Sequence, residues 1–164
     1  MNRKILKSVP VFLSIVLVIS LIACNPATKY EKDEKNAITA YLNSDTSKHF
    51  IKESSGMYYL ETLLGTGRQP VIHDTATVIY TGKFLNGTVF DTNVGGTKLV
   101  FPVDEGQMIP GFEEGISYMK EGGKATFLIP SSLAYGTQGY YTVPGYTPLL
   151  YDVELVKVAA GPGK

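Results

Sequence analysis

The chain lacks several residue types on which many enzymes and small stabilised domains depend. It has no tryptophan, only two histidines, His49 and His73, and a single cysteine, Cys24. One cysteine excludes an intrachain disulfide. The two histidines are far apart in sequence and have no ligand-spaced partners, which argues against a metal site. We therefore expect no metal and no cofactor.

Charge of a dominant sign is also missing. Lys plus Arg and Asp plus Glu number 15 each among the 164 residues, so composition gives no sign of a nucleic-acid partner. Neither Gly-Gly pair is followed by the Lys-Ser/Thr of a phosphate loop. The adjacent acids at 104–105 and 113–114 suit solvated surfaces or a helix start better than an acid–base pair. No nucleophilic centre is indicated.

The N-terminus has the pattern of a bacterial lipoprotein signal. Basic residues precede an uncharged run over residues 9–23, which is shorter than the roughly 20 residues of a spanning helix. The run ends Leu-Ile-Ala before Cys24, which resembles a lipobox. We expect 1–23 to be a lipoprotein signal peptide, and Cys24 to be lipidated by acyl chains such as palmitate. The alternatives are an ordinary signal peptide before a free thiol and a bitopic anchor.

Lipidation predicts a location. Each buried CH₂ group of an acyl chain contributes about 0.8 kcal/mol to membrane binding, so several chains anchor firmly. Asn25, rather than Asp, follows the cysteine, and in well-understood bacteria this favours the outer membrane. We expect a lipid-anchored protein of the cell envelope, in the outer rather than the inner membrane, with its domain in the periplasm or at the cell surface.

Residues 24–55 are expected to form the lipidated Cys and a polar, partly helical tether. Residues 29–42 have helix-forming composition, with Ile38, Tyr41 and Leu42 on one side. This helix is either a spacer or an element that packs on the domain or pairs with a second copy. Its apolar stripe covers only one or two turns, so we expect a monomer.

Residues 56–158 have the pattern of a β-rich domain. Alternating or β-branched runs predict strands, at residues 57–64, 75–84, 89–91, 98–101, 124–130 and 149–158. Asn86-Gly87 between two of these runs predicts a hairpin with a type I′ turn. Residues 159–164 are expected to be a disordered tail.

One short helix is expected among these strands, within residues 103–120. Phe112, Ile116 and Met119 recur at spacings of four and three, so they share one helical face. A single helix among strands can bury its apolar face by packing against one side of a curved sheet. The fold class we predict is α+β, with a strongly curved antiparallel sheet of about five strands wrapped around this helix.

Aromatic residues gather near expected strand ends and glycine-rich loops. As a set they indicate a concave apolar site with a few polar tips. The set is Tyr80, Phe90, Phe101, Phe112, Tyr135, Tyr140, Tyr141, Tyr146 and Tyr151. For Phe101, as for Phe127 outside this set, we expect a place in the core.

Several motifs in the domain follow one another in a specific order. They are Tyr80-Thr81-Gly82, Gly87 through Phe90-Asp91, Val103 to Gly115, Gly122 to Ile129, Ala134-Tyr135-Gly136, and Val143-Pro144 through Leu155. In this order they resemble the FK506-binding-protein (FKBP) family of peptidyl-prolyl cis-trans isomerases, over roughly residues 57–158. The resemblance implies the same curved sheet around one helix.

The resemblance also implies a set of site residues. The catalytic residues would be Tyr80, Phe90, Asp91, Ile109, Phe112 and Tyr135, and the substrate-binding residues Met108, Val143 and Tyr151. Phe112 would form the pocket floor, and the Ile109 N–H and Tyr135 hydroxyl would donate to substrate carbonyls. Two residues depart from the family: Phe112 replaces the usual Trp, and Leu99 replaces a common aromatic.

The implied activity explains the missing nucleophile. Rotation about an X-Pro bond breaks no covalent bond, and its barrier of roughly 18–20 kcal/mol comes from amide resonance. A dry aromatic pocket disfavours the polar planar amide relative to the twisted one. The expected partners are proline-containing polypeptides of the envelope and FK506-like macrolides. The alternatives are a low-turnover proline-peptide-binding module and a structural lipoprotein of an envelope assembly.

Overall fold

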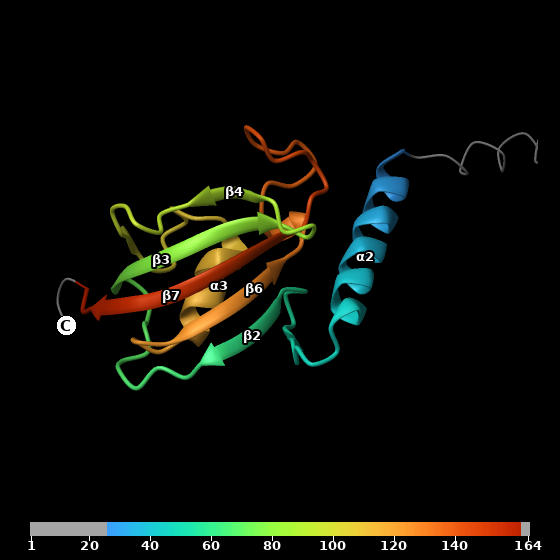
Figure 1. Cartoon of the computed structure of the whole chain (residues 1–164). Helices are drawn as coiled ribbons and strands as arrows, with labels where there is room; N and C mark the ends of the chain where they lie inside the picture. The colour runs from blue at the N-terminus through green and yellow to red at the C-terminus, as the bar shows by residue number, and fades with distance from the viewer. Residues whose placement is uncertain (1–25, 162–164) are drawn as a thin grey trace, which may run out of the picture.

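The computed structural model describes residues 26–161 as two helices, a short 3₁₀ turn and one sheet (Figure 1). The elements in chain order are α2 (Pro26–Ser44), β1 (Ile51–Lys52), β2 (Tyr58–Leu63), β3 (Thr75–Phe84), β4 (Val89–Thr92), β5 (Leu99–Pro102), α3 (Pro110–Tyr118), β6 (Lys124–Ile129), η1 (Ser131–Leu133) and β7 (Leu149–Ala159). The signal-peptide and lipidation predictions, for 1–23 and Cys24, lie outside the described residues.

The sheet has seven strands, in the order β1-β2-β6-β7-β3-β4, with β5 paired to β3. All its pairings are antiparallel. Every strand run expected from the sequence is present, and the fold class is confirmed. The estimate of about five strands was low. Six strands match the six expected runs, and the seventh is β1, whose two residues are both exposed.

Helix α3 lies against one face of the sheet (Figure 1). Phe112 and Ile116 are fully buried, and Met119 just after the helix is 1% exposed, so the expected face is confirmed. Gly115 allows a close approach, since a Cβ there would lie 2.6 Å from the Phe127 ring. The main core lies between this helix and the sheet.

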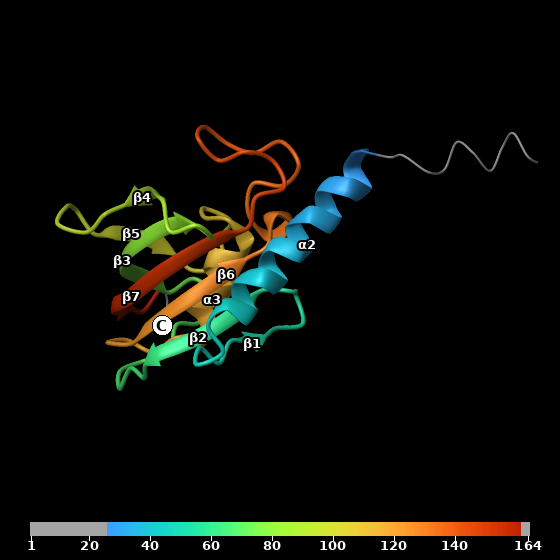
Figure 2. The ribbon, with the colours of Figure 1, turned by 45° about the vertical axis from the view of Figure 1, so that its right-hand side comes forward.

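Helix α2 lies on the opposite face (Figure 2). Side chains alternate between the two faces of a strand. Phe127 on β6 therefore points into the main core, while its neighbour Leu128 packs with Ile38 of α2 and Leu150 of β7. The helix is longer than expected, and it packs on the domain instead of serving as a free spacer.

Polar and aromatic contacts complete the attachment of α2. The Glu34 carboxylate accepts hydrogen bonds from the backbone N–H of Ser131, at 2.5 Å, and from its hydroxyl, at 2.7 Å. Near the start of the helix, Tyr30 stacks on Tyr146 with ring centroids 5.3 Å apart. These contacts join α2 to the segment that follows β6.

Two local expectations need correction. The β3–β4 hairpin is present, but Phe84 donates its N–H to the Thr88 carbonyl across a loop of residues 85–87 in which only Gly87 has a positive φ, of 87°. A hairpin with a type I′ turn has two loop residues, so this loop is one residue longer than expected. The tail was expected from residue 159, but β7 includes Ala159 and the Gly161 N–H donates to the buried Asp74.

Candidate active site

An aromatic cavity of about 430 Å³ opens at the start of α3. One wall comes from the segment leading into the helix, another from the loop after η1, and a third from β7. The lining residues are Gln107, Met108, Ile109, Pro110, Phe112, Tyr135, Tyr140 and Tyr151. The site expected from the sequence is therefore partly assembled around one hollow.

Phe112 forms the buried end of this cavity. It has no exposed surface, and it sits at the centre of a cluster of rings. Its ring centroid lies 5.2 Å from that of Tyr151, 5.9 Å from Tyr80 and 6.0 Å from both Phe101 and Phe127. Edge-on arrangements at such distances are favourable, so the floor is held rigidly from below.

A second ring wall flanks the floor. Phe90 meets Tyr151 edge-on at 5.7 Å and packs against Phe84 at 5.2 Å. Gly82 makes room for these rings, because a Cβ at this position would lie 2.7 Å from Phe90 and 3.1 Å from Tyr151. Phe90 does not line the cavity itself but supports the rings that do.

Tyr80 and Asp91 form the polar edge of the ring cluster. The Tyr80 hydroxyl donates to Asp91 Oδ2 at 2.6 Å. Burial raises the pKa of Tyr80, and the hydrogen bond and charge of Asp91 raise it further. The pKa of Tyr151 is also raised, chiefly by burial and then by its neighbour Tyr135. Both phenols therefore stay protonated and able to donate at neutral pH.

The segment before α3 presents a backbone donor. The buried Glu113 carboxylate accepts N–H bonds from Gly106, at 3.2 Å, and Met108, at 3.0 Å. The Ile109 carbonyl accepts from the N–H groups of Phe112 and Glu113. Within residues 26–161 no group accepts from the Ile109 N–H, and Ile109 lines the cavity, so this donor is available at the cavity edge.

The loop after η1 forms the outer rim. Tyr135 stacks on Tyr140 at 5.4 Å, with their planes 16° apart. Tyr140 and Val143 exchange two backbone hydrogen bonds, of 2.8 and 2.9 Å. Val143 is 5% exposed and does not line the cavity, so it supports the rim from beneath while Tyr140 lines the surface. Tyr140 was in the expected aromatic set but not among the expected catalytic or substrate-binding residues, and Gln107 and Pro110 were in neither.

The chemistry available here is non-covalent. The cavity combines aromatic walls with the Ile109 N–H and phenolic hydroxyls. Among residues 26–161 there is no cluster of three His, Cys, Asp or Glu side chains that could hold a metal ion. Such a site can enclose an apolar ring and bond the carbonyls on either side of it.

The comparisons with known proteins agree with this geometry. A family model for FKBP-type peptidyl-prolyl cis-trans isomerases matches residues 66–156. A probable FKBP-type isomerase, FkpA, of Neisseria meningitidis serogroup B is 41% identical over 139 residues, which cover 77% of this chain and 50% of the relative. The chain spans about half the length of the curated relatives it matches.

Solved structures show the same fold. A peptidyl-prolyl isomerase of Pseudomonas syringae pv. tomato has a TM-score of 0.70 at 26% identity, covering 84% of this chain and 99% of that one. FkpA of Escherichia coli has a TM-score of 0.69 at 30% identity, covering 93% of this chain and 73% of that one. The latter match includes almost all the described residues.

Proposed function

The chain belongs to the FKBP-type peptidyl-prolyl cis-trans isomerases, and we propose that it catalyses cis-trans isomerisation of X-Pro bonds in proline-containing polypeptides. One observation carries the proposal: the ring-lined cavity places an unpartnered backbone N–H, that of Ile109, at the entrance to a buried aromatic floor. A proline ring is apolar and compact, and its flanking peptide carbonyls are acceptors. The cavity matches both features.

The cavity would lower the barrier through its polarity. A planar amide separates charge between nitrogen and oxygen, and twisting removes this separation. Aromatic walls that exclude water disfavour the planar form more than the twisted one. The Ile109 N–H and the Tyr135 hydroxyl would hold flanking carbonyls in the twisted geometry. Each ~1.4 kcal/mol of preference for the twisted amide raises the rate tenfold.

Asp91 would act through Tyr80. Its carboxylate holds the Tyr80 hydroxyl at 2.6 Å, which fixes the ring that packs against both Phe112 and Tyr151. Asp91 is itself exposed at the rim, where it also places negative charge near the twisting nitrogen. This hydrogen bond thus orients one of the four rings that surround the floor.

The direct test is a protease-coupled assay with a proline tetrapeptide. We expect acceleration above background, and a fall in kcat/KM of at least about tenfold for Phe112→Ala, corresponding to ~1.4 kcal/mol of transition-state stabilisation. Val100→Ala is the control, since Val100 lies outside the cavity and is 58% exposed. If the isomerisation rate with the protein equals the uncatalysed rate while the peptide still binds, the proposal of catalysis is contradicted.

That outcome would instead support a low-turnover binding module. Two residues favour this second candidate: Phe112 is smaller than the Trp usual in the family, and Leu99 replaces a common wall aromatic. Phe112→Trp separates the two readings. If the floor limits turnover, kcat rises in this variant; if the chain only binds proline peptides, affinity changes and kcat stays at background.

We also propose that FK506-like macrolides bind in the same cavity. Its aromatic walls and the Ile109 N–H would serve a macrolide as they serve proline. Because Phe112 offers less surface than Trp, we expect tighter binding by Phe112→Trp than by the original chain. Titration calorimetry with FK506 measures the difference, and failure of FK506 to inhibit isomerisation would refute a shared site.

For location, we propose that lipidated Cys24 anchors the protein to the cell envelope, at the outer rather than the inner membrane. The lipobox-like sequence supports this. Helices long and apolar enough to cross a bilayer are not found among residues 26–161. Cys24→Ser should shift the protein from the membrane to the soluble fraction, and firm membrane attachment of that variant would contradict lipidation.

A monomeric state completes the proposal. The apolar side of α2 is covered within one chain, where Ile38 packs with Leu128 and Leu150. This leaves little of the stripe for a second copy. Sedimentation of the chain without its first 23 residues should give the mass of one copy, and a concentration-dependent dimer would contradict it.

A further inference from the structure

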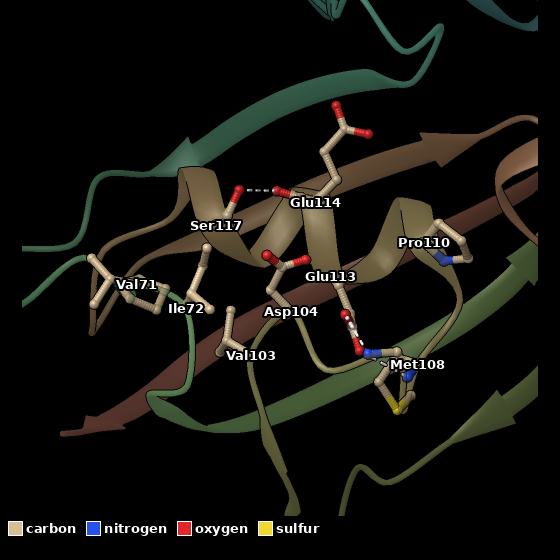
Figure 3. A pocket seen from close by; sticks show the side chains of 11 residues that line it. Val71, Ile72, Val103, Asp104, Met108, Pro110, Glu113, Glu114 and Ser117 are labelled. Atoms are coloured by element: carbon tan, nitrogen blue, oxygen red, sulfur yellow. Dashed lines mark hydrogen bonds between the residues drawn. The ribbon is translucent and has the colours of Figure 1, made fainter. Parts of the chain in front are cut away.

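A second and larger cavity, of about 740 Å³, lies beside the start of α3 (Figure 3). One wall is the segment between β2 and β3, and the other is the segment between β5 and α3 together with the exposed side of the helix. Its apolar surface comes from Pro70, Val71, Ile72, Val103, Met108 and Pro110. We refer to it as the α3 groove.

The α3 groove adjoins the proline cavity. Met108 and Pro110 line both hollows, so a polypeptide bound in the proline cavity has the groove directly beside it. Val71 and Ile72 on its far wall are 49% and 53% exposed. Large apolar side chains in a hollow that adjoins a peptide site are typical of a binding surface.

The walls of the groove are fixed in place. Fully buried Asp74 accepts a 2.6 Å bond from Arg68 and a 3.0 Å bond from the Val71 N–H. The Val103 N–H donates to the Asp74 carbonyl, and the Val103 carbonyl accepts from His73. Asp74 thus forms hydrogen bonds to residues of both walls. A preformed groove loses little conformational entropy when it is occupied.

Charge in the α3 groove has one sign. Its charged lining residues are Asp104, Glu113 and Glu114, with no lysine or arginine. Glu113 is committed to backbone N–H groups, and Glu114 accepts from the Ser55 and Tyr118 hydroxyls. Exposed Asp104 has no hydrogen bond or ion pair within residues 26–161. Among the described residues, no Lys, Arg or His forms an ion pair with Asp104 or Glu114.

We propose that the α3 groove is a second subsite for the polypeptide whose proline occupies the cavity, and that it binds an apolar side chain next to a Lys or Arg. The apolar side chain packs on Val71 and Ile72, and the basic group pairs with Asp104, whose side chain lies on the same side of α3 as these residues (Figure 3). This inference rests on the proposed function. It adds a preference for sequence beyond the proline itself.

The test compares two lengths of peptide on the full chain. The short probe is an Ala-Ala-Pro-Phe tetrapeptide, and the long probes extend it by six residues carrying either Leu-Lys or Ala-Glu. We expect the Leu-Lys peptide to have a KM about tenfold below that of the Ala-Glu peptide. Extensions on both sides of the proline are tried, because either direction satisfies the proposal.

Two variants assign the preference to the groove. Ile72→Ser should raise the KM of the Leu-Lys peptide about tenfold relative to that of the short peptide. Asp104→Asn should reduce the Lys preference about threefold and weaken its salt dependence. Asn suits this position, because the φ of residue 104 is 63° and Asn tolerates positive values. Val94→Ser, at a 64% exposed residue, is the control.

The outcomes distinguish this inference from the proposed function. Equal KM values for both long peptides, unchanged in Ile72→Ser, would overturn the α3 groove while leaving isomerisation intact. If the short peptide is not isomerised at all, the proposed function fails. In that case, amide NMR chemical shifts test peptide binding in the α3 groove by itself. Shift changes at Val71 and Ile72 on addition of the Leu-Lys peptide support binding there, and changes confined to other residues overturn it.

Discussion

Helices α3 and α2 lie on opposite faces of one sheet, yet they are attached to it in different ways. α3 is embedded in a continuous core, where Phe112 and Ile116 are fully buried. α2 touches the other face through a small cluster centred on Ile38, and through the Glu34 carboxylate. The first helix is part of the fold, whereas the second is added to a fold that is already closed.

The difference separates stability from positioning. α3 carries the floor of the cavity, so changes on its buried face affect folding and the site together. α2 instead reaches Ser131 and Tyr146, which flank the loop bearing Tyr135 and Tyr140. Changes in α2 should therefore disturb the rim of the site at a smaller cost in stability.

The largest expected effect is that of Ile116→Ala. Removal of a fully buried side chain between α3 and the sheet should cost about 4 kcal/mol of unfolding free energy, within the range for such truncations. Urea denaturation measures this value. Val94→Ala, at an exposed site, should stay within about 0.5 kcal/mol. If Ile116→Ala loses less unfolding free energy than Ile38→Ala in α2, then α3 is not the more stabilising of the two helices.

Ile38→Ala is the matching change in α2. Ile38 is 7% exposed and packs in a small cluster, so we expect a loss of about 2 kcal/mol, at the low end of the range. The same urea titration applies. A second, earlier transition in the helical circular-dichroism signal alone would sharpen the comparison, because it would show α2 detaching before the sheet unfolds.

Glu34→Gln tests the polar joint between α2 and the rim. The amide keeps one acceptor but loses the charge that both Ser131 donors share, so stability should fall by about 1 kcal/mol. If the rim that carries Tyr135 binds substrate as proposed, KM should rise more than kcat falls. Glu31→Gln, at an exposed residue of the same helix, is the control. Identical kinetics in both variants would separate α2 from the site.

The smallest expected effect lies on the α3 side, at Tyr59. Its buried hydroxyl has no hydrogen-bond partner among the described residues, so Tyr59→Phe should be neutral within about 0.5 kcal/mol at pH 7. Burial, then the charges of Glu61 and Glu53, raises the pKa of Tyr59 to about 12. The measurement is unfolding free energy against pH, between pH 7 and 11.5.

The sign of that pH dependence follows from the two pKa values. The unfolded chain loses the Tyr59 proton near pH 10, and the folded chain holds it until about 12. The stability from this group is complete below pH 10 and declines as pH rises toward 12. The Phe variant should therefore lose less stability in this window, and equal losses would show that Tyr59 does not contribute.

The sequence predicted the sheet well because strand periodicity is a local signal. Thr75–Phe84 and the start of β7 were located to the residue. The hairpin at Asn86-Gly87 was predicted, but its turn type was wrong, because the sequence does not show that Phe84 and Thr88 are the closing pair. The exposed pair Ile51–Lys52 carries no such periodicity, which explains why β1 was missed.

Long-range features were out of reach of local patterns. Phe112 and Tyr151 were in the aromatic set that indicated an apolar site, but nothing local to either residue shows that their rings meet, 5.2 Å apart. The Glu34–Ser131 bond joins residues 97 positions apart, and nothing near Glu34 indicates its partner. The α3 groove combines residues 70–72 with the start of α3, and exposed apolar residues such as Val71 resemble ordinary loop residues until the fold brings them together.

The position of β7 also governs when the molecule can fold. It is the last strand of the sheet in the sequence, yet it lies at the centre, between β6 and β3. During synthesis the earlier strands leave the ribosome without the neighbour that joins them, so only β1 with β2, β2 with β6, and β3 with β4 and β5 can pair beforehand. Non-local pairing of this kind slows folding. The nascent chain therefore stays open until Leu149–Ala159 emerges, and both helices find their permanent places only after that.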